Sequence, residues 1–588
     1  MSDIPIPAHQ LHYADPAVND EAQLLPIIPF VDRIHYPTLG APALLTAKQP
    51  LVVLLSLPQG EDPAAVSLSL VDRHGGTGER PLSLTGAPSS LGLGPHGKHG
   101  RRELWRLPCA LDGHSFRLFD LRVRSGDAEE TQPNAVRVFE VITGDEKVVF
   151  CGDAQYHVRN AACLERFVDS INRRDDIAWV ALIGDVCDNG VRGVSNVLRL
   201  ALTAKPEPVR SYYVDEFRDT AGRILPALNK PIVLIPGNHD GMVAFEHYSP
   251  GTPTDVYLDP DPGNAVAYDG LHHFRRSFGP LYHAFTWHRT RYICANSFEL
   301  DRHDRAGYHA VVANWGGWVR DEQLGWLEGE LAAASADGLH KVVLVHHDPR
   351  GGCRGRDLGW YSEVRRYTVN QAVDVVGAYL RYLAGHARTW QQEWMARPGQ
   401  PIAEHPVRRL LSALLEHRVW AVLMGHDNEN WVETYVEGDT LFTNDPVRRD
   451  YPPRQTESVD PALVLTAADL LGAGELPELA TRLDVLSDRE ADTVITLALE
   501  RLDAEGAFER PASYAPGEVE AWRLQAKAPI HFAHVDDVGA YAYAKETDFT
   551  KYGYVVAQLH EGRPILLQHF DLRNETPGAV VDLIEKAE

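Results

Sequence analysis

Short apolar or alternating runs fill the first 145 positions of the chain. They include PLVVLLSL, AVSLSLVD, ELWRLPCAL, FRLFDLRV and AVRVFEVI, and turn sequences rich in Gly, Pro and Asp separate them. Alternation at this spacing is typical of strands in a sandwich. The pattern predicts an N-terminal all-β sandwich domain over residues 1–145. No chemical motif lies there, so we expect it to pack against the rest of the chain or to cover a substrate site.

From Glu146 the runs have a different character. KVVFCGD, IAWVALIGD, PIVLIPGNHD, KVVLVHHDP and VWAVLMGHD are mostly apolar and end abruptly in Gly, Asp, Asn or His. Continuous apolar strands indicate burial on both faces, as in sheets that helices cover. Helical patterns lie between them, at residues 161–174, 194–204 and 320–334. An α/β core over residues 146–447 follows from this order, with ligands expected at the carboxyl ends of its strands.

Two stretches are predicted to be helical insertions, because helical patterns interrupt the strand order there. They cover about residues 351–406 and residues 448–527. Residues 528–588 then contain a hairpin pattern, with Glu561 and Gly562 at its turn. We expect these C-terminal strands to return to the core sheet. A chain of 588 residues is too long for one hydrophobic core, which agrees with several units.

Composition narrows the classes of partner. The formal net charge of −25 argues against a nucleic acid or an anionic membrane as partner, because both demand a basic surface. A small phosphorylated substrate remains compatible, since bound cations reverse the local sign of charge. The sequence shows no secretory signal and no apolar run of bilayer length. Its six scattered cysteines form no CxxC pair, which predicts reduced thiols in a cytoplasmic protein.

Polar residues with metal-binding side chains follow each of the five core strands. They are Asp153 and Gln155, Asp185 and Asp188, Asn238, His239 and Asp240, His346 and His347, and His426 and Asn428. Two divalent cations held a few ångströms apart need several ligands each and a carboxylate that bridges both. Strand ends give such ligands a rigid support. The pattern therefore predicts a dinuclear metal centre.

The ordered series GDAQ, GDVCDN, GNHD, VHHDP and GHDN resembles the motifs of the calcineurin-like metallophosphoesterases. That family carries D-x-H, G-D-x-x-D, G-N-H-D/E, a His before x-P, and G-H-x-H in this order. The match runs from Glu146 to about Pro446. The resemblance implies a two-sheet α/β sandwich flanked by helices. It also implies hydrolysis of a phosphomonoester, a phosphodiester or a pyrophosphate.

The resemblance also implies a role for each matching residue. Asp185 would bridge two divalent metal ions, and His239, oriented by Asp188, would stabilise the phosphate and protonate the leaving oxygen. A metal-bound hydroxide would be the nucleophile. The remaining ligands would divide into Asp153, Gln155 and Asn428 for the first metal, and Asn238, His346 and His426 for the second.

Two positions depart from the family pattern, and both belong to the first metal. Gln155 and Asn428 stand where the family has histidines. Amide oxygens are hard, neutral donors, so Mn²⁺ is the expected cation, with Mg²⁺, Fe²⁺ and Zn²⁺ as alternatives, and binding should be weaker. A D-x-Q first motif also occurs in some manganese-dependent nucleotide-diphosphate hydrolases of this family. His157 is an alternative ligand to Gln155.

His346 and His347 compete for one ligand role. His346 directly follows the apolar strand VVLV and is the favoured ligand. His347 is then expected to face the substrate or to have a structural role.

Smaller candidates follow the same region. Trp315 and Trp318 lie in a Gly-rich loop, where packing is favoured over stacking on a base. Three arginines after the fourth motif could either grip a distal phosphate or lie in a solvated loop. They are Arg350, Arg354 and Arg356.

Two other readings remain open from the sequence. The chain could be a non-catalytic interaction protein in which Gln155 and Asn428 have weakened the first metal site. It could also be a mononuclear phosphoesterase that uses only the second metal. The retained His239 and Asp185 favour the dinuclear enzyme.

Overall fold

The computed structural model describes most of the β-rich parts of the chain. The described residues are 34–72, 78–93, 102–111, 116–156, 161–187, 213–241, 271–299, 319–350, 406–426, 430–442, 458–473, 475–483, 523–535 and 552–587, with single residues and pairs elsewhere. Among these residues, no helix combines the length and the hydropathy that a membrane-spanning segment requires.

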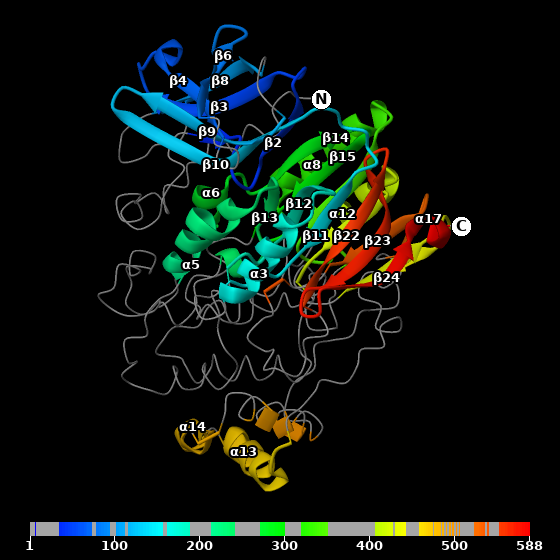
Figure 1. The fold of residues 1–588 in the computed structure, drawn as a ribbon. Coiled ribbons are helices and arrows are strands. Elements are labelled where there is room, and N and C mark those ends of the chain that lie inside the picture. The colour runs from blue at the N-terminus through cyan, green and yellow to red at the C-terminus, as the bar shows by residue number, and fades with distance from the viewer. Residues whose placement is uncertain are drawn as a thin grey trace.

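Two five-stranded sheets lie at the N-terminal end of the molecule (Figure 1). The first contains β1 (Ile34–Tyr36), β3 (Leu51–Pro58), β8 (Arg102–Ala110), β6 (Ser83–Leu84) and β7 (Ser89–Leu93). The second contains β2 (Ala43–Thr46), β10 (Ala128–Phe139), β9 (Leu118–Ser125), β4 (Ser67–Val71) and β5 (Glu79–Pro81). A short 3-10 helix, η1 (Pro63–Ala65), precedes β4. Each of the five apolar runs noted in this part of the sequence forms one of these strands.

Alternating side chains build the core between these two sheets. Leu51, Val53 and Leu55 of β3 pack there with Leu121 and Val123 of β9. Val52 and Leu54 on the opposite face of the strand are buried as well, which explains the apolar run from Leu51 to Leu55. The two sheets therefore share one core, as in a sandwich. The predicted end of this domain at residue 145 stays a prediction.

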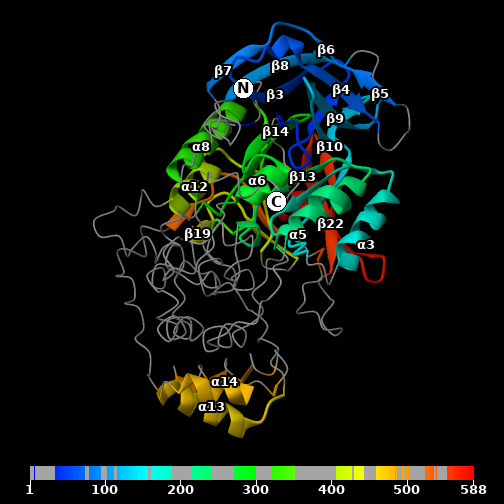
Figure 2. The same cartoon turned by 90° about the vertical axis from the view of Figure 1, so that its left-hand side faces the viewer.

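Backbone hydrogen bonds join the N-terminal sheets to the rest of the chain. The Leu234 amide donates to the Gly40 carbonyl over 2.8 Å, and the Gly40 amide donates to the Phe278 carbonyl over 2.8 Å. The buried Asn134 side chain donates to the carbonyls of Pro226 and Leu228 at 3.1 and 2.9 Å. These bonds fix the N-terminal sheets on the core, in the arrangement seen in Figures 1 and 2.

Two six-stranded sheets form the core itself. One contains β13 (Ile232–Ile235), β12 (Ile177–Ile183), β11 (Lys147–Cys151), β22 (Gly553–His560), β23 (Arg563–Asp571) and β24 (Thr576–Asp582). The other contains β14 (His283–Trp287), β15 (Thr290–Ala295), β16 (His340–Val345), β17 (Ala421–Met424), β21 (Ile530–His534) and β18 (Trp431–Tyr435). Strands β11, β12 and β13 are parallel to one another, and so are β15, β16, β17 and β21.

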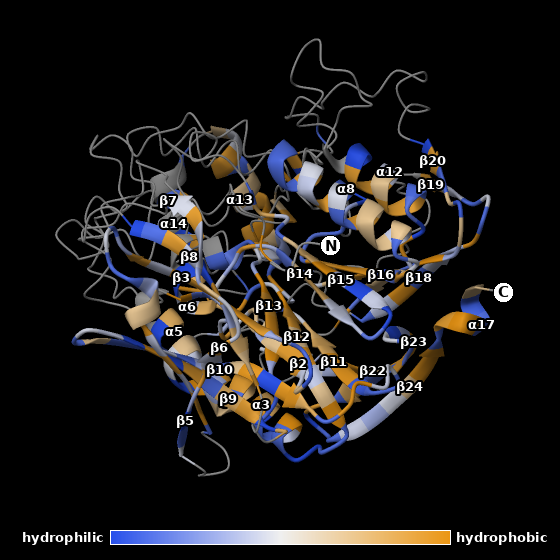
Figure 3. Ribbon diagram, turned by 90° about the horizontal axis from the view of Figure 1, so that it is seen from above, coloured by the Kyte–Doolittle hydropathy of each residue, from blue (hydrophilic) through white to orange (hydrophobic). Residues whose placement is uncertain are grey.

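Apolar residues of both sheets meet in one layer, which includes Phe150, Trp179, Trp287 and Leu344. The central strands are strongly hydrophobic along their length (Figure 3) because both of their faces are covered. The chain therefore has the predicted α/β class, with two core sheets packed face to face between helices.

Helices cover the outer face of each sheet. The first sheet is covered by α3 (Ala161–Asn172), α5 (Tyr213–Asp219), the π-helical turn η2 (Thr220–Ile224), η3 (Leu225–Ala227) and α6 (His272–Phe278). The second is covered by α8 (Asp321–Ala336) and α12 (Pro406–Glu416). A last helix, α17 (Leu583–Ala587), ends the described chain. In α3 the buried residues Leu164, Phe167, Val168 and Ile171 recur at helical spacing, which places one apolar face on the sheet.

The predicted C-terminal hairpin is confirmed, because β22 and β23 pair in antiparallel register around Glu561 and Gly562. Both turn residues have positive φ, of 52° and 87°, as a two-residue hairpin loop requires. β22 also pairs with β11, so the C-terminal strands return to the core sheet.

Within residues 448–527, α13 (Pro461–Ala473) packs against α14 (Leu476–Leu483). The last residues of this stretch form β20 (Arg523–Gln525), which pairs with β19 (Thr440–Phe442). The predicted helix at 194–204 and the insertion up to residue 405 lie outside the described residues. The predicted domain boundaries stay predictions.

Candidate metal centre

The predicted ligands converge because they follow strands that end at one edge of the two core sheets. Asp153 follows β11, Asp185 follows β12, and Asn238 follows β13 in one sheet, while His346 and His426 follow β16 and β17 in the other. All except His426 are buried, and His426 is half-buried.

The backbone is turned sharply at four of the predicted ligands. Asp153, Gln155, Asp185 and His426 have φ angles of 50°, 36°, 54° and 72°, in the left-handed region that non-glycine residues rarely adopt. A hydrogen bond joins the loop after β11 to the loop after β12, because the backbone amide of Gln155 donates to the carbonyl of Asp185 over 2.7 Å. Conformations of this kind cost of order 1–3 kcal/mol each and cluster at functional sites.

Glycines next to the ligands allow the loops to approach closely. A Cβ atom at Gly184, which has a φ of 84°, would collide with the ring of His346. A Cβ atom at Gly237 would collide with the carboxylate of Asp185. The Gly-Asp and Gly-Asn pairs of the sequence therefore serve the packing of ligands from different strands.

Asp153, Gln155 and Asp185 form what we call the oxygen side of the site. Oδ2 of Asp153 accepts a 2.7 Å hydrogen bond from the amide of His426. Ligand atoms of Asp153, Asp185 and His346 all lie within 4.8 Å of one another. Nε2 of Gln155 donates to Oδ2 of Asp185 over 3.3 Å, and among the described residues Oε1 of Gln155 has no hydrogen-bond partner although it is buried. A buried oxygen of this kind fits a cation.

Asn238, His346 and His426 form the imidazole side. Oδ1 of Asn238 lies 3.1 Å from Nε2 of His346 and 2.9 Å from Nδ1 of His426. Oδ1 of Asp185 lies 3.3 Å from the same Nε2 atom, so Asp185 touches both sides.

The tautomer of His346 is set by the backbone. Its Nδ1 donates to the carbonyl of Ile183 over 2.8 Å, so Nδ1 carries a proton. In a neutral ring the lone pair of Nε2 would then point at the oxygens of Asp185 and Asn238. That arrangement is stable only if a proton or a metal ion lies between them, and a second ring nitrogen bonded to a carbonyl is the usual state of a metal-binding histidine. The donor set therefore fits a divalent cation.

The charges of the site agree with this geometry. Burial alone would raise the pKa of Asp185, but positive charge on His346 and His239 lowers that pKa well below its usual range. Burial lowers the pKa of His346, yet the Asp185 carboxylate outweighs burial and raises it. Burial and the nearby charge of Asp185 raise the pKa of Asp240 to about 7.

His239, the residue expected to act on the substrate, lies next to the predicted metal ligands. His239 lies in η4 (His239–Gly241), directly after Asn238, and its amide donates to Oδ1 of Asp185 over 2.8 Å. Its Nε2 lies 3.9 Å from Oδ2 of Asp185, and its side chain is 11% exposed. His239 is therefore close to the ligands and retains a small exposed fraction. Its expected partner Asp188, the ligand Asn428 and the alternative ligand His157 lie outside the described residues.

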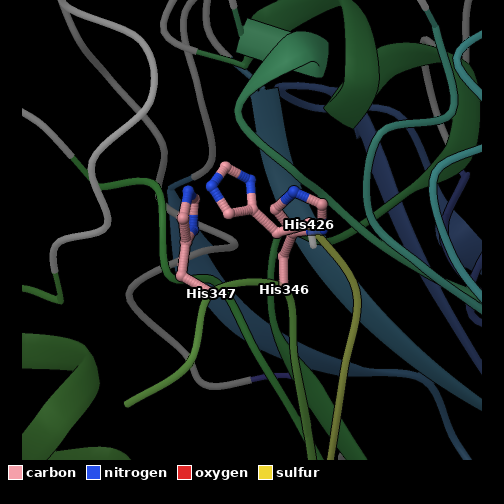
Figure 4. Close-up of side chains that lie close together, drawn as sticks. All are labelled: His346, His347 and His426. Atoms are coloured by element: carbon pink, nitrogen blue, oxygen red, sulfur yellow. The ribbon is translucent and has the colours of Figure 1, made fainter. Parts of the chain in front are cut away.

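A third histidine lies in the same cluster (Figure 4). Ligand nitrogens of His346, His347 and His426 all lie within 4.8 Å of one another. The ring centroids of His347 and His426 are 4.4 Å apart. Nδ1 of His347 lies 2.7 Å from the hydroxyl of Ser297, which the sequence analysis did not single out. The only signal for Ser297 was its position at the end of the strand sequence RYICANS.

The predicted roles of Arg350 are both wrong. Its side chain is buried rather than solvated, and it donates to Oδ2 of Asp348 over 2.7 Å and also contacts Glu433. The guanidinium lies 4.2 Å from the ring centre of Phe532. These contacts leave it paired inside the fold, so it is not placed to grip a phosphate. Arg354, Arg356, Trp315 and Trp318 lie outside the described residues.

His534, the last residue of β21, was not among the predicted site residues. Its Nδ1 lies 3.1 Å from the carbonyl of Gly425, the residue before His426, and its Nε2 lies 3.6 Å from Oδ2 of Asp348. Its ring stacks on Trp431 at 4.3 Å. His534 thus connects the Asp348–Arg350 pair to the loop that carries His426.

Comparisons with known proteins agree with the motifs. The family model described as calcineurin-like phosphoesterase matches residues 146–427. No curated protein matches the chain. Among solved structures the chain is similar to one titled "GAP50 the anchor in the inner membrane complex of Plasmodium", at 12% identity and a TM-score of 0.23 over 50% of this chain and 68% of that one. At this TM-score the likeness carries no argument.

Proposed function

We propose that the chain, which carries a calcineurin-like phosphoesterase domain over residues 146–427, hydrolyses a phosphomonoester, a phosphodiester or a pyrophosphate with the help of divalent cations. One observation carries this proposal. Carboxylate, amide and imidazole groups from five separate strand ends are linked by contacts of 2.7–3.3 Å into one cluster that includes Asp185. Such a donor set suits two cations with a shared carboxylate.

The two sides of the site suggest how cations would be held. The oxygen side would bind one through Asp153, Gln155 and Asp185, and the imidazole side would bind the other, with Asp185 shared. Asn428 would complete the first set. Divalent cations bound there would activate a water molecule for attack and neutralise the negative charge of the phosphate.

The residues of the chain perform the remaining tasks. The carbonyl of Ile183 keeps the Nδ1 proton on His346, so Nε2 presents its lone pair to a ligand position. Asp153 holds the backbone of His426 in its left-handed conformation. In this proposal His239, whose side chain is 11% exposed beside Asp185, gives a proton to the leaving oxygen. In this proposal Asp188 orients the His239 ring.

Mn²⁺ is the cation that we propose for the oxygen side. Its donors are two carboxylates and an amide oxygen, and such hard donors suit Mn²⁺ or Mg²⁺ better than Zn²⁺. We propose a small phosphorylated molecule as substrate rather than a nucleic acid, because the net charge of −25 repels polyanions.

An assay with a chromogenic phosphodiester, a chromogenic monoester and nucleotide diphosphates tests the proposal. Wild type should turn over at least one of them only when Mn²⁺ is present, and His239→Ala should lose most of this activity. His417→Ala is the matched control, since His417 follows α12 and contacts Ser335 instead of the site. Absence of metal-dependent turnover on all three substrates would favour a non-catalytic protein. One bound metal ion per active chain would favour the mononuclear enzyme.

A further inference from the structure

We propose that His347 is a third imidazole ligand of the cation that His346 and His426 would hold. The inference rests on the metal centre proposed above but not on its hydrolytic activity. It assigns a metal-binding role to a residue that the sequence pattern left as substrate-facing or structural.

The positions of the three rings support this role. Their centroids lie 4.9 Å (His346 to His347), 5.1 Å (His346 to His426) and 4.4 Å (His347 to His426) apart. One nitrogen of each ring lies within 4.8 Å of one nitrogen of both others. Ligand atoms around one cation are roughly 3–4 Å apart when metal–nitrogen bonds are about 2.1 Å. Small side-chain rotations therefore suffice to bring the three nitrogens to one ion, and Figure 4 shows the rings gathered at the loop ends.

Ser297 orients the ring of His347. Its hydroxyl accepts a 3.0 Å hydrogen bond from the His347 amide and lies 2.7 Å from Nδ1 of the same residue. A hydroxyl oxygen has two acceptor positions, so it can also accept from Nδ1. That bond places the proton on Nδ1 and makes Nε2 the metal-binding nitrogen, as the carbonyl of Ile183 does for His346. Phe298 stacks on the ring at an angle of 19° and limits its rotation.

A structural role alone explains this arrangement less well. His347 is 1% exposed and belongs to the same cluster as two predicted ligands. A buried imidazole that packs against two others without a cation would be favoured only as a neutral ring. A shared cation instead accounts for three imidazole rings that meet at one place in the interior.

The inference makes the two metal positions chemically unequal. The imidazole side would offer three nitrogens, whereas the described donors of the oxygen side are carboxylate and amide oxygens. Imidazole suits Zn²⁺, and oxygen ligands suit Mn²⁺ and Mg²⁺. We therefore expect the chain to bind two different cations from a mixture, with the softer ion beside His347.

The test is calorimetric titration of the metal-free, full-length protein with Co²⁺, together with the visible absorption of the bound cobalt. Wild type, His347→Gln and Ser297→Ala are compared, with His417→Gln as the control. We expect His347→Gln to weaken one binding event at least about 10-fold, to leave the other unchanged, and to alter the cobalt spectrum. Ser297→Ala should weaken the same event less, and it serves as the decisive variant if His347→Gln does not fold.

Four outcomes separate the possibilities. Unchanged cobalt affinity and spectrum in both site variants would overturn the role of His347, and a raised KM without a change in metal binding would assign it to the substrate. No cobalt binding by the wild type would overturn this inference together with the proposed metal centre. Cobalt binding that depends on His347 in a protein without phosphoesterase activity would support the inference while rejecting the proposed function.

Discussion

The oxygen side and the imidazole side of the candidate centre are held in different ways. On the oxygen side the backbone is turned at each of the three residues, with left-handed conformations at Asp153, Gln155 and Asp185, whereas of the described ligands on the imidazole side only His426 has one. On the imidazole side the rings of His346 and His347 are each oriented by a partner on another segment. The carbonyl of Ile183 accepts a hydrogen bond from Nδ1 of His346, and the hydroxyl of Ser297 lies beside Nδ1 of His347.

The difference follows from the ligands. A carboxylate offers equivalent oxygens, so the fold only has to bring it to the right place. An imidazole must also present the correct nitrogen, so the fold has to control its tautomer. The buried Asp348–Arg350 pair and His534 extend this support to the loop of His426. We therefore expect substitutions on the oxygen side to change metal binding by moving the backbone. Substitutions on the imidazole side should change it by altering the orientation of the rings.

The largest effect is expected where the two sides meet. Asp185→Asn keeps the shape of the side chain but removes the charge shared by both positions. We expect loss of both metal ions and a decrease in kcat/KM of about 1000-fold, since metal ions contribute several kcal/mol to such reactions. Metal content and turnover are measured together. Asp176→Asn, at an exposed Asp paired with Arg174, is the control and should change neither quantity.

The next largest effect is expected on stability, when the buried Asp348–Arg350 pair beside the imidazole side is broken. Arg350→Met removes the guanidinium that pairs with the buried Asp348 carboxylate, which should lower the free energy of unfolding by about 3–5 kcal/mol. Arg409→Met removes a more exposed pair with Asp321 and should cost less than about 1 kcal/mol. Urea unfolding of both variants gives the comparison. An equal decrease in unfolding free energy in the two variants would mean that the buried pair contributes no more to stability than the exposed one.

A substitution on the oxygen side should change metal preference rather than stability. Gln155→His restores an imidazole where the family pattern has one. We expect the apparent affinity of the oxygen side for Zn²⁺ relative to Mn²⁺ to rise about 10-fold, because an imidazole nitrogen replaces an amide oxygen. Competition between the two ions during metal loading measures this ratio. An unchanged ratio would show that Gln155 is not a ligand.

Acid should weaken the sheet that carries the imidazole side. Burial, together with nearby positive charge, lowers the pKa of His283 on β14 to about 3 and that of His531 on β21 to about 4. In the unfolded chain these groups titrate near 6.5. Between these values the unfolded state binds more protons, so stability is complete above about pH 6.5 and falls as the pH decreases.

Replacing one of these groups should reduce the acid sensitivity. His283→Leu is expected to flatten the pH dependence of the unfolding free energy by about 1.4 kcal/mol per pH unit between pH 6 and 4.5. Urea unfolding at several pH values measures the slope. The same slope in the variant and in wild type would contradict the assignment of His283 as a neutral buried group.

The sequence was sufficient to predict those parts of the molecule whose structure depends on the local pattern of residues. The five strands that end in polar residues were predictable, because apolar runs followed by glycine and a ligand leave little choice of structure. The roles of Ser297, His534 and Arg350 were not predictable in the same way. Ser297 meets His347 across 50 positions, and His534 meets Gly425 across 109. Arg350 looked like a loop residue because its aromatic and acidic surroundings come from β18 and β21.

The central claim is that one site holds two cations on chemically unequal sides. Anomalous X-ray scattering from crystals grown with both Mn²⁺ and Zn²⁺ tests it most directly, at the absorption edge of each metal. The account predicts two peaks about 3.5–4 Å apart on either side of Asp185. The zinc signal should lie beside His346, His347 and His426, and the manganese signal beside Asp153 and Gln155. Two peaks of identical metal content would contradict the difference between the sides, and the absence of any peak among these residues would contradict the metal centre itself.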